Sequence, residues 1–219
     1  MIGTKQARDW YDPLPAALRE ELLWIKDNVD LGAGRNVLDG GCHHGIHTVT
    51  MAGECNLLAM DVHRPNITML EVNAAINGLR VDFCHGAITH IDGTTIYNGE
   101  PLGVLTPNCD VQVKVPCVRI PTIMPDVNVV KLDIEGSEFQ VIPDCIDELE
   151  DADTWIVEMH PFRRAPDKDG YAAMYELLDM FEARKYTAHW IDRAEEKPYV
   201  RPYRWEPVRM YSVFFLQRQ

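Results

Sequence analysis

The chain has 219 residues, of which 46% are hydrophobic, and it carries a formal net charge of -13 at pH 7. This length predicts one compact domain, residues 1–219, with a sizeable core. The acidic balance argues against a phosphate-binding surface, because such surfaces need clustered lysine and arginine. We therefore expect a small-molecule partner and no nucleic acid.

No apolar run reaches the roughly 20 residues that cross a bilayer, and charged residues occur throughout residues 1–29, unlike in a signal peptide. These features predict a cytoplasmic protein without membrane contact. The cysteines are scattered and form no CxxC pair, so we expect reduced, mostly buried thiols. They are Cys42, Cys55, Cys84, Cys109, Cys117 and Cys145.

Residues 1–30 are predicted to form an N-terminal helical segment. Its apolar face is defined by residues at helical spacing, namely Leu18, Leu22, Ile25 and Val29. This face should pack against a sheet. The preceding pair, Trp10 and Tyr11, is expected to cover the edge of the core or, alternatively, to close over a pocket.

Short strand-like runs alternate with helical patterns through the rest of the chain. The predicted strands are 37–38, 56–60, 81–84, 129–133, 154–159, 186–191 and 210–216. The alternation predicts a doubly wound, mostly parallel sheet, and the last two strands, with no helix between them, must run antiparallel. The predicted class is therefore α/β, with a Rossmann-like, seven-stranded sheet and an antiparallel last strand. Residues 88–125 interrupt the pattern with turn signals, which predict an irregular β-ribbon or loop insertion.

The glycine-rich segment 36–45, NVLDGGCHHG, organises the predicted site. The first strand ends at Asp39, and the glycines after it let backbone approach a small ligand. Asp61 ends the second strand 22 residues later, near the offset of about 20 residues at which a carboxylate accepts hydrogen bonds from a ribose diol. A ribose-bearing cofactor is therefore expected at the carboxyl ends of the strands. Asp39 would bind the cofactor's amino group or cap the turn.

Four motifs carry a resemblance to a known family: VLDGGCHHG (37–45), DVHRP (61–65), LEVNAAING (70–78) and KLDIEGSE (131–138). With them the chain resembles FkbM-family class I S-adenosylmethionine-dependent methyltransferases. The resemblance implies a Rossmann-like class I fold, S-adenosylmethionine as the cofactor, and O-methylation of a hydroxyl group on a sugar, polyketide or similar metabolite. The chain departs from the family at Cys42 and His43, where alanine and asparagine are usual, and at Asp61, where glutamate is usual.

The resemblance also implies the cofactor-binding residues. The glycine turn and Asp39 would line the methionine end, Thr48 would contact the carboxylate, Asp61 would hold the ribose, and Val62, Gly86 and Ala87 would surround the adenine. The full set is Asp39, Gly40, Gly41, Cys42, His43, Gly45, Thr48, Asp61, Val62, Gly86, Ala87 and Asp133.

Methyl transfer to a hydroxyl needs alignment and a group that takes the proton. Four side chains after the fourth and fifth strands should face one cleft: Asp133, Glu135, Glu158 and His160. We assign catalysis to His160, Glu135 and Asp133. Two alternatives remain open, in which His160 orients its loop and Glu135 caps the helix beginning near Ser137.

The same four groups offer ligands for a divalent metal, which is kept as an alternative and not as the favoured assignment. Three further histidines, His43, His44 and His47, lack zinc-site spacing and are expected to line the cofactor or face solvent.

Two other functions stay open at this point. One is a noncatalytic module that binds S-adenosylmethionine or another nucleoside and regulates a partner. The other is a nicotinamide-dependent oxidoreductase. The sequence leaves the methyl acceptor unidentified, and a homo-oligomer is compatible with it.

Overall fold

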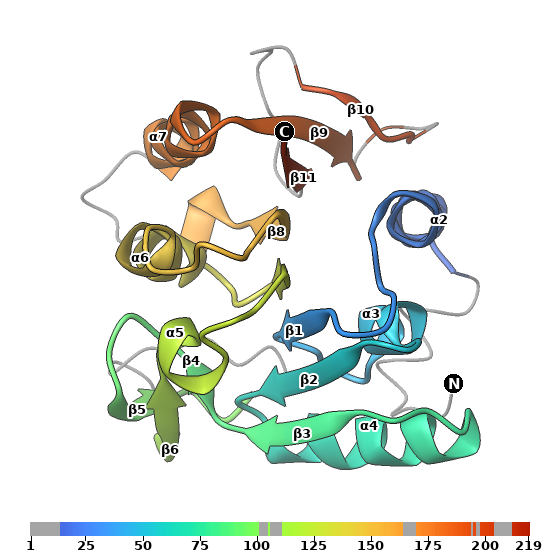
Figure 1. Cartoon of the computed structure of the whole chain (residues 1–219). Coiled ribbons are helices and arrows are strands. Elements are labelled where there is room, and N and C mark those ends of the chain that lie inside the picture. Colours follow the sequence, from blue (N-terminus) through green and yellow to red (C-terminus); the bar gives the residue numbers. More distant parts are fainter. Residues whose placement is uncertain are drawn as a thin grey trace.

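The computed structural model describes residues 14–100, 105, 111–163, 170–193, 195, 198–203 and 212–219 (Figure 1). The expectations for Trp10, Tyr11 and Cys109, and for the first two residues of the predicted last strand, lie outside the described residues. None of the helices in the described ranges is long and apolar enough to cross a membrane.

Within the described residues the main sheet has eight strands, in the order β10-β9-β11-β8-β7-β1-β2-β3. Strands β3, β2, β1, β7 and β8 pair in parallel, and β11 runs antiparallel to both β8 and β9. The predicted fold class is therefore confirmed. The strands are β1 (Asn36–Gly40), β2 (Asn56–Asp61), β3 (Asp82–His85), β7 (Val129–Leu132), β8 (Thr154–Met159), β9 (Tyr186–Asp192), β10 (Arg201–Pro202) and β11 (Ser212–Arg218).

The eighth strand, β10, was not predicted. It pairs antiparallel with β9 at the edge of the sheet, where Arg201 lies opposite Trp190. A proline lacks the backbone N–H that an inner strand needs, so Pro202 fits only such an edge. The sequence around it is short and polar, which explains why no periodic pattern marked it as a strand.

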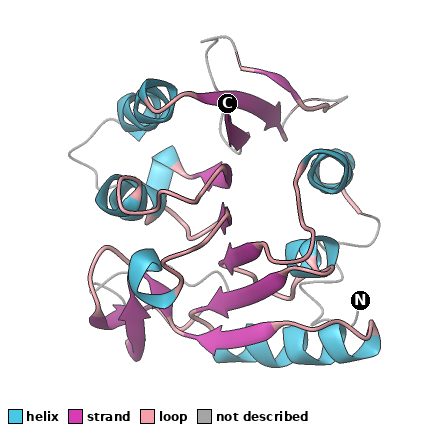
Figure 2. Cartoon of the chain, viewed as in Figure 1, coloured by secondary structure: helices cyan, strands magenta, loops and turns pink. Residues whose placement is uncertain are grey.

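Helices cover both faces of the sheet (Figures 1 and 2). Side chains alternate along β1, so Val37 packs with residues of α2 and α3, whereas Leu38 packs with residues of α6 and α7. On β2, Ala59 packs with α4. The helices are α2 (Ala16–Asn28), α3 (Ile46–Met51), α4 (Arg64–Ile76), α5 (Ile120–Ile123), α6 (Glu138–Cys145) and α7 (Gly170–Ala183), with a 3₁₀ turn, η1 (Pro161–Arg163).

In the described part of the insertion predicted at 88–125, a small three-stranded sheet in the order β4-β6-β5 begins one residue earlier, at Ala87. Its strands are β4 (Ala87–Ile88), β5 (Gly93–Tyr97) and β6 (Val113–Val118). In Figure 1 this sheet lies beyond the arrowheads of β2 and β3. The insertion thus stands at the carboxyl edge of the main sheet, where ligands bind in folds of this kind.

Among the described cysteines, Cys42, Cys55, Cys117 and Cys145 are buried and Cys84 is partly exposed. All five are free thiols. This agrees with the expectation of reduced, mostly buried cysteines.

Candidate active site

The turn after β1 is held against two neighbouring strands. The backbone N–H groups of Gly41 and Cys42 donate to the carbonyl oxygen of Met60 on β2, at 2.9 and 3.1 Å. Gly41 has φ +72°, and a Cβ atom there would lie 1.8 Å from the carbonyl oxygen of Asp133. Glycine is therefore required so that the turn can approach the end of β7.

A buried ion pair lies beneath this turn. Asp39 is fully buried and accepts a hydrogen bond from the Thr48 hydroxyl at 2.5 Å. Lys131 Nζ lies 3.1 Å from Asp39 Oδ1 and donates to the Gly41 carbonyl at 2.9 Å. Burial opposes the charge of Lys131, but the carboxylates of Asp39 and Asp133 hold its pKa above the usual value. The pair and Thr48 therefore fix the shape of the turn.

Asp61 stands at the end of β2 with 7% of its surface exposed. Its Oδ2 accepts a hydrogen bond from the His43 N–H at 2.9 Å, and its Oδ1 accepts bonds from the His63 N–H at 2.8 Å and Asn66 Nδ2 at 3.1 Å. Burial raises the pKa of Asp61 to about 6, and these hydrogen bonds limit the rise. A carboxylate oxygen can accept two hydrogen bonds, so Oδ2, which accepts from the His43 N–H, has capacity for a ligand hydroxyl.

The residues expected around the adenine lie beside Asp61. Gly86 donates its N–H to the Asp61 carbonyl at 3.0 Å, and a Cβ atom on Gly86 would lie 2.9 Å from the Pro116 carbonyl. Ala87 is buried in the small sheet, and Val62 packs against the same cluster. The small sheet therefore forms the wall on this side of Asp61.

The remaining turn residues have distinct surroundings. Cys42 is buried against Ala59 and Ile67, so only its backbone lines the turn. His43 has φ +48°, which is uncommon for a residue other than glycine, and burial lowers its pKa to about 3. Gly45, at φ +89°, precedes α3.

The histidines that follow are interior residues. His44 and His47 are buried, so the alternative that they face solvent is wrong. His47 Nε2 lies 2.7 Å from Glu21 Oε1 on α2. This contact joins α3 to α2 beneath the site.

The loop between β7 and α6 is shaped by Glu138. This buried carboxylate accepts hydrogen bonds from the N–H groups of Ile134 and Gly136, both at 2.8 Å. Glu138, the first residue of α6, therefore holds this loop. The N-cap position of α6 is occupied by Ser137, so the alternative that Glu135 caps this helix is wrong, and Glu135 takes a left-handed conformation at φ +55°.

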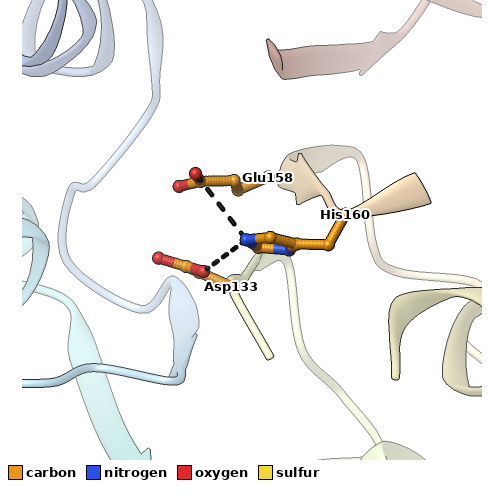
Figure 3. Close-up of side chains that lie close together, drawn as sticks. All are labelled: Asp133, Glu158 and His160. Carbon is orange, nitrogen blue, oxygen red and sulfur yellow. Dashed lines mark ion pairs between the residues drawn. The ribbon is translucent and has the colours of Figure 1, made fainter. Parts of the chain in front are cut away.

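The structure brings the four expected side chains together at the carboxyl ends of β7 and β8. Figure 3 shows three of them, Asp133, Glu158 and His160. His160 Nε2 lies 3.7 Å from Asp133 Oδ1, 3.8 Å from Glu158 Oε1 and 3.9 Å from Glu135 Oε2. Burial opposes protonation of His160, but Glu138, Asp133 and Glu158 raise its pKa to about 10. Without a ligand, His160 is therefore an imidazolium at neutral pH. A general base must be unprotonated, so His160 in this state cannot take the proton of the acceptor hydroxyl.

An arginine missed in the sequence supports this cluster. Arg193 Nη2 lies 2.7 Å from Glu21 Oε2, and its Nη1 lies 2.7 Å from Glu158 Oε2. Burial and the nearby Asp133 raise the pKa of Glu158 to about 7, although Arg193 opposes the rise. Arg193 follows β9 directly. A charged residue at the end of this strand was the signal from which its place in the site could have been predicted.

Glu21→Gln should lower the free energy of unfolding by about 3 kcal/mol at pH 7, because it breaks a buried ion-pair network. Burial alone would raise the pKa of Glu21, but Arg193 and His47 lower it to about 2 from the usual 4.5. Its contribution is therefore complete above pH 4.5 and is lost as the pH falls toward 2. Urea unfolding at several pH values measures the difference. Glu20→Gln, on the same helix, is the control, and an equal loss at pH 7 and pH 3 would contradict the assignment.

Comparisons with known proteins identify the family and the fold. The model of the FkbM methyltransferase domain matches residues 39–188. A comparison with curated protein sequences found no match.

Several solved structures share the fold. An O-methyltransferase from Bacillus cereus in complex with SAH has a TM-score of 0.53 and 11% identity over 100% of this chain and 93% of that chain. An rRNA methylase from Streptococcus thermophilus has a TM-score of 0.52 and 13% identity over 94% and 97%. A precorrin 8w decarboxylase from Methanobacterium thermoautotrophicum has a TM-score of 0.51 and 17% identity over 90% and 89%. At these identities the likeness concerns the fold alone.

Proposed function

The chain belongs to the FkbM methyltransferase family, and we propose that it transfers the methyl group of S-adenosylmethionine to a hydroxyl group of a small metabolite. One observation carries this proposal: the glycine turn lies between Asp61 on one side and the His160 cluster on the other. The contact that joins the two halves is the close approach of Gly41 to Asp133. A cofactor in the turn would thus present its methyl group toward the cluster.

The proposed cofactor pose follows the contacts around the turn. Asp61 Oδ2 accepts a ribose hydroxyl, and the wall formed by Gly86, Ala87 and Val62 borders the adenine. The methionine end lies along the turn from Gly40 to Gly45. Asp39 and Thr48 support this turn from beneath through the ion pair with Lys131.

The transfer is an in-line displacement. The acceptor oxygen forms a bond to the methyl carbon, the bond from that carbon to sulfur breaks, and S-adenosylhomocysteine leaves as a neutral thioether. The hydroxyl proton passes to a carboxylate. Glu135 is our choice, because His160 is already protonated and Glu158 is paired with Arg193. His160 and Asp133 shape the pocket around the acceptor.

The charge around the cluster favours a hydroxyl acceptor without phosphate groups. Asp133, Glu135 and Glu158 place three carboxyl groups within 4 Å of His160 Nε2. Such a site repels a phosphate backbone, and the chain's net charge of -13 adds to the repulsion. The shared fold does not choose the acceptor, since proteins described as an O-methyltransferase and as an rRNA methylase both have it.

Binding of S-adenosylhomocysteine is the first test. At a ligand concentration 100 times its dissociation constant, the complex should gain about 2.7 kcal/mol of stability, which for a domain of this size raises Tm by roughly 5 to 10 °C. NAD should give no shift. A shift with NAD and none with S-adenosylhomocysteine would instead support an oxidoreductase.

Methyl transfer is then measured with labelled S-adenosylmethionine against sugars, phenols and polyketide alcohols, with ribosomal and transfer RNA as contrasting substrates. We expect label on a small hydroxyl compound and none on RNA. Labelled RNA would overturn the acceptor class while leaving methyl transfer intact. Cofactor binding with no transfer to any of these acceptors would favour the noncatalytic module.

A further inference from the structure

We propose that Asp133, Glu158 and His160 form a binding site for a divalent cation of the Mn²⁺ type, which holds the acceptor hydroxyl. The existence of the site is independent of the proposed function, whereas its role in methyl transfer rests on that function. These three residues present ligand atoms that all lie within 4.8 Å of one another (Figure 3).

The three atoms that face one another in this cluster are more widely spaced than the ligands of a bound ion. His160 Nε2 lies 3.7 Å from Asp133 Oδ1 and 3.8 Å from Glu158 Oε1, too far for hydrogen bonds. Ligands at right angles around an ion at about 2.1 Å are about 3.0 Å apart. The two distances from His160 Nε2 would therefore have to shorten by about 0.7 to 0.8 Å, and the carboxylate oxygens of Asp133 and Glu158, which lie within 4.8 Å of each other, would have to close on the same ion.

The outward atoms of the same side chains are held by other residues. His160 Nδ1 lies 3.2 Å from Glu138 Oε1, and Glu158 Oε2 lies 2.7 Å from Arg193 Nη1. A histidine that donates Nδ1–H to a carboxylate and points Nε2 at a metal is the usual outer-shell arrangement of metal sites. Binding of the ion would release to solvent the proton that Nε2 carries in the unliganded protein. Asp133 is held less closely: its Oδ2 lies 4.0 Å from Lys131 Nζ, an ion-pair distance too long for a hydrogen bond, while its Oδ1 lies 3.7 Å from His160 Nε2.

The mixed ligand set indicates the kind of ion. Carboxylate oxygens suit Mg²⁺ and Mn²⁺, and an imidazole nitrogen shifts the preference toward Mn²⁺. Glu135 Oε2, at 3.9 Å from His160 Nε2, adds a third carboxylate at the side of the set. The ion's remaining positions would hold water or the acceptor.

The site is continuous with the cofactor turn. The Asp133 N–H donates to the Gly40 carbonyl at 3.0 Å, so the candidate ligand set begins where the turn ends. A bound ion lowers the pKa of a coordinated hydroxyl. The hydroxyl proton would pass to Glu135, and the oxygen would form its bond to the methyl carbon as the bond from carbon to sulfur breaks.

Titration with Mn²⁺ followed by electron paramagnetic resonance tests the site, because the six-line signal of the aqueous ion is lost on binding. We expect one bound ion in the unmodified protein. His160→Gln, Glu158→Gln and Asp133→Asn should each weaken binding about 100-fold or more, since even outer-shell changes cost 10-fold to 100-fold. His189→Gln on β9 and Asp147→Asn on the surface remove the same chemical groups elsewhere and should leave Mn²⁺ affinity unchanged.

Thermal unfolding of each variant, without metal, identifies those that fail to fold, and Asp133→Asn, at the most exposed of the three ligands, is the mildest change. No Mn²⁺ binding at millimolar concentration, or equal binding by the ligand variants and the controls, would overturn the proposal. Tight Zn²⁺ binding without Mn²⁺ binding would also overturn it. S-adenosylhomocysteine binding in the presence of a chelator is measured separately, so failure of the metal site and failure of the methyltransferase function give different results.

Discussion

Gly41→Ala should lower the free energy of unfolding by about 4 kcal/mol or more, or prevent folding. The added Cβ atom would lie 1.8 Å from the Asp133 carbonyl oxygen and 2.8 Å from its carbonyl carbon. These are backbone atoms at the end of β7, so no side-chain rotation relieves the clash. The overlap adds to the strain of φ +72° and to the general cost of overpacking. Urea unfolding monitored by circular dichroism measures the loss.

Gly34→Ala is the matched control for this variant. Gly34 has φ +84°, but nothing lies within 4 Å of the Cβ atom that alanine would add. Only backbone strain remains, so we expect a loss of about 1 to 2 kcal/mol. Similar losses for the two variants would show that the turn does not press against β7, and the proposed link between the cofactor turn and the His160 cluster would then fail.

The sequence predicted the fold because its signals are local and repeated. Alternating strand and helix patterns determine a parallel sheet with few acceptable topologies, and the missing helix before the last strand predicts its antiparallel direction. The same topology places the carboxyl ends of β1, β2 and β7 at one edge. Asp39, Asp61 and Asp133 were therefore predicted to lie together without any knowledge of their contacts.

The sequence did not predict the partners of these groups. Lys131 pairs with Asp39 across 92 positions, and Arg193 joins Glu21 to Glu158 across three elements. Such pairs depend on tertiary packing, and the local periodicity of the sequence does not predict which distant residues meet.

The sequence also did not show which of two nearby glutamates accepts the backbone N–H groups of the loop after β7. The carboxylate that holds the loop after β7 belongs to Glu138 and not to Glu135. The loop takes a left-handed conformation at Glu135, and the Glu138 carboxylate then accepts hydrogen bonds from two backbone N–H groups of the loop. The KLDIEGSE motif contains both glutamates, so the pattern alone could not choose between them. A lysine inside an apolar strand, as in VVKLD, was the one visible signal of a buried acidic partner.

Asp61→Asn should weaken S-adenosylhomocysteine binding about 100-fold, because the ribose would lose charge-assisted hydrogen bonds worth about 1.5 to 3 kcal/mol each. The His43 and His63 N–H groups also depend on this carboxylate, so the free protein should be less stable. Isothermal calorimetry measures the affinity. Asp82→Asn, an exposed change of the same charge at the first residue of the neighbouring strand β3, is the control and should leave the affinity unaltered.

The pH dependence of S-adenosylhomocysteine binding tests whether the ionised carboxylate of Asp61 supports the cofactor site. Burial raises the pKa of Asp61 to about 6, so the carboxylate is mostly ionised at pH 7 and mostly protonated at pH 5. Since the ionised form accepts the ribose hydroxyls, affinity should fall about tenfold between these values in the unmodified protein. In Asp61→Asn the affinity should be flat over the same range. A fall of equal size in the variant would assign the pH dependence to another group and remove Asp61 from the cofactor site.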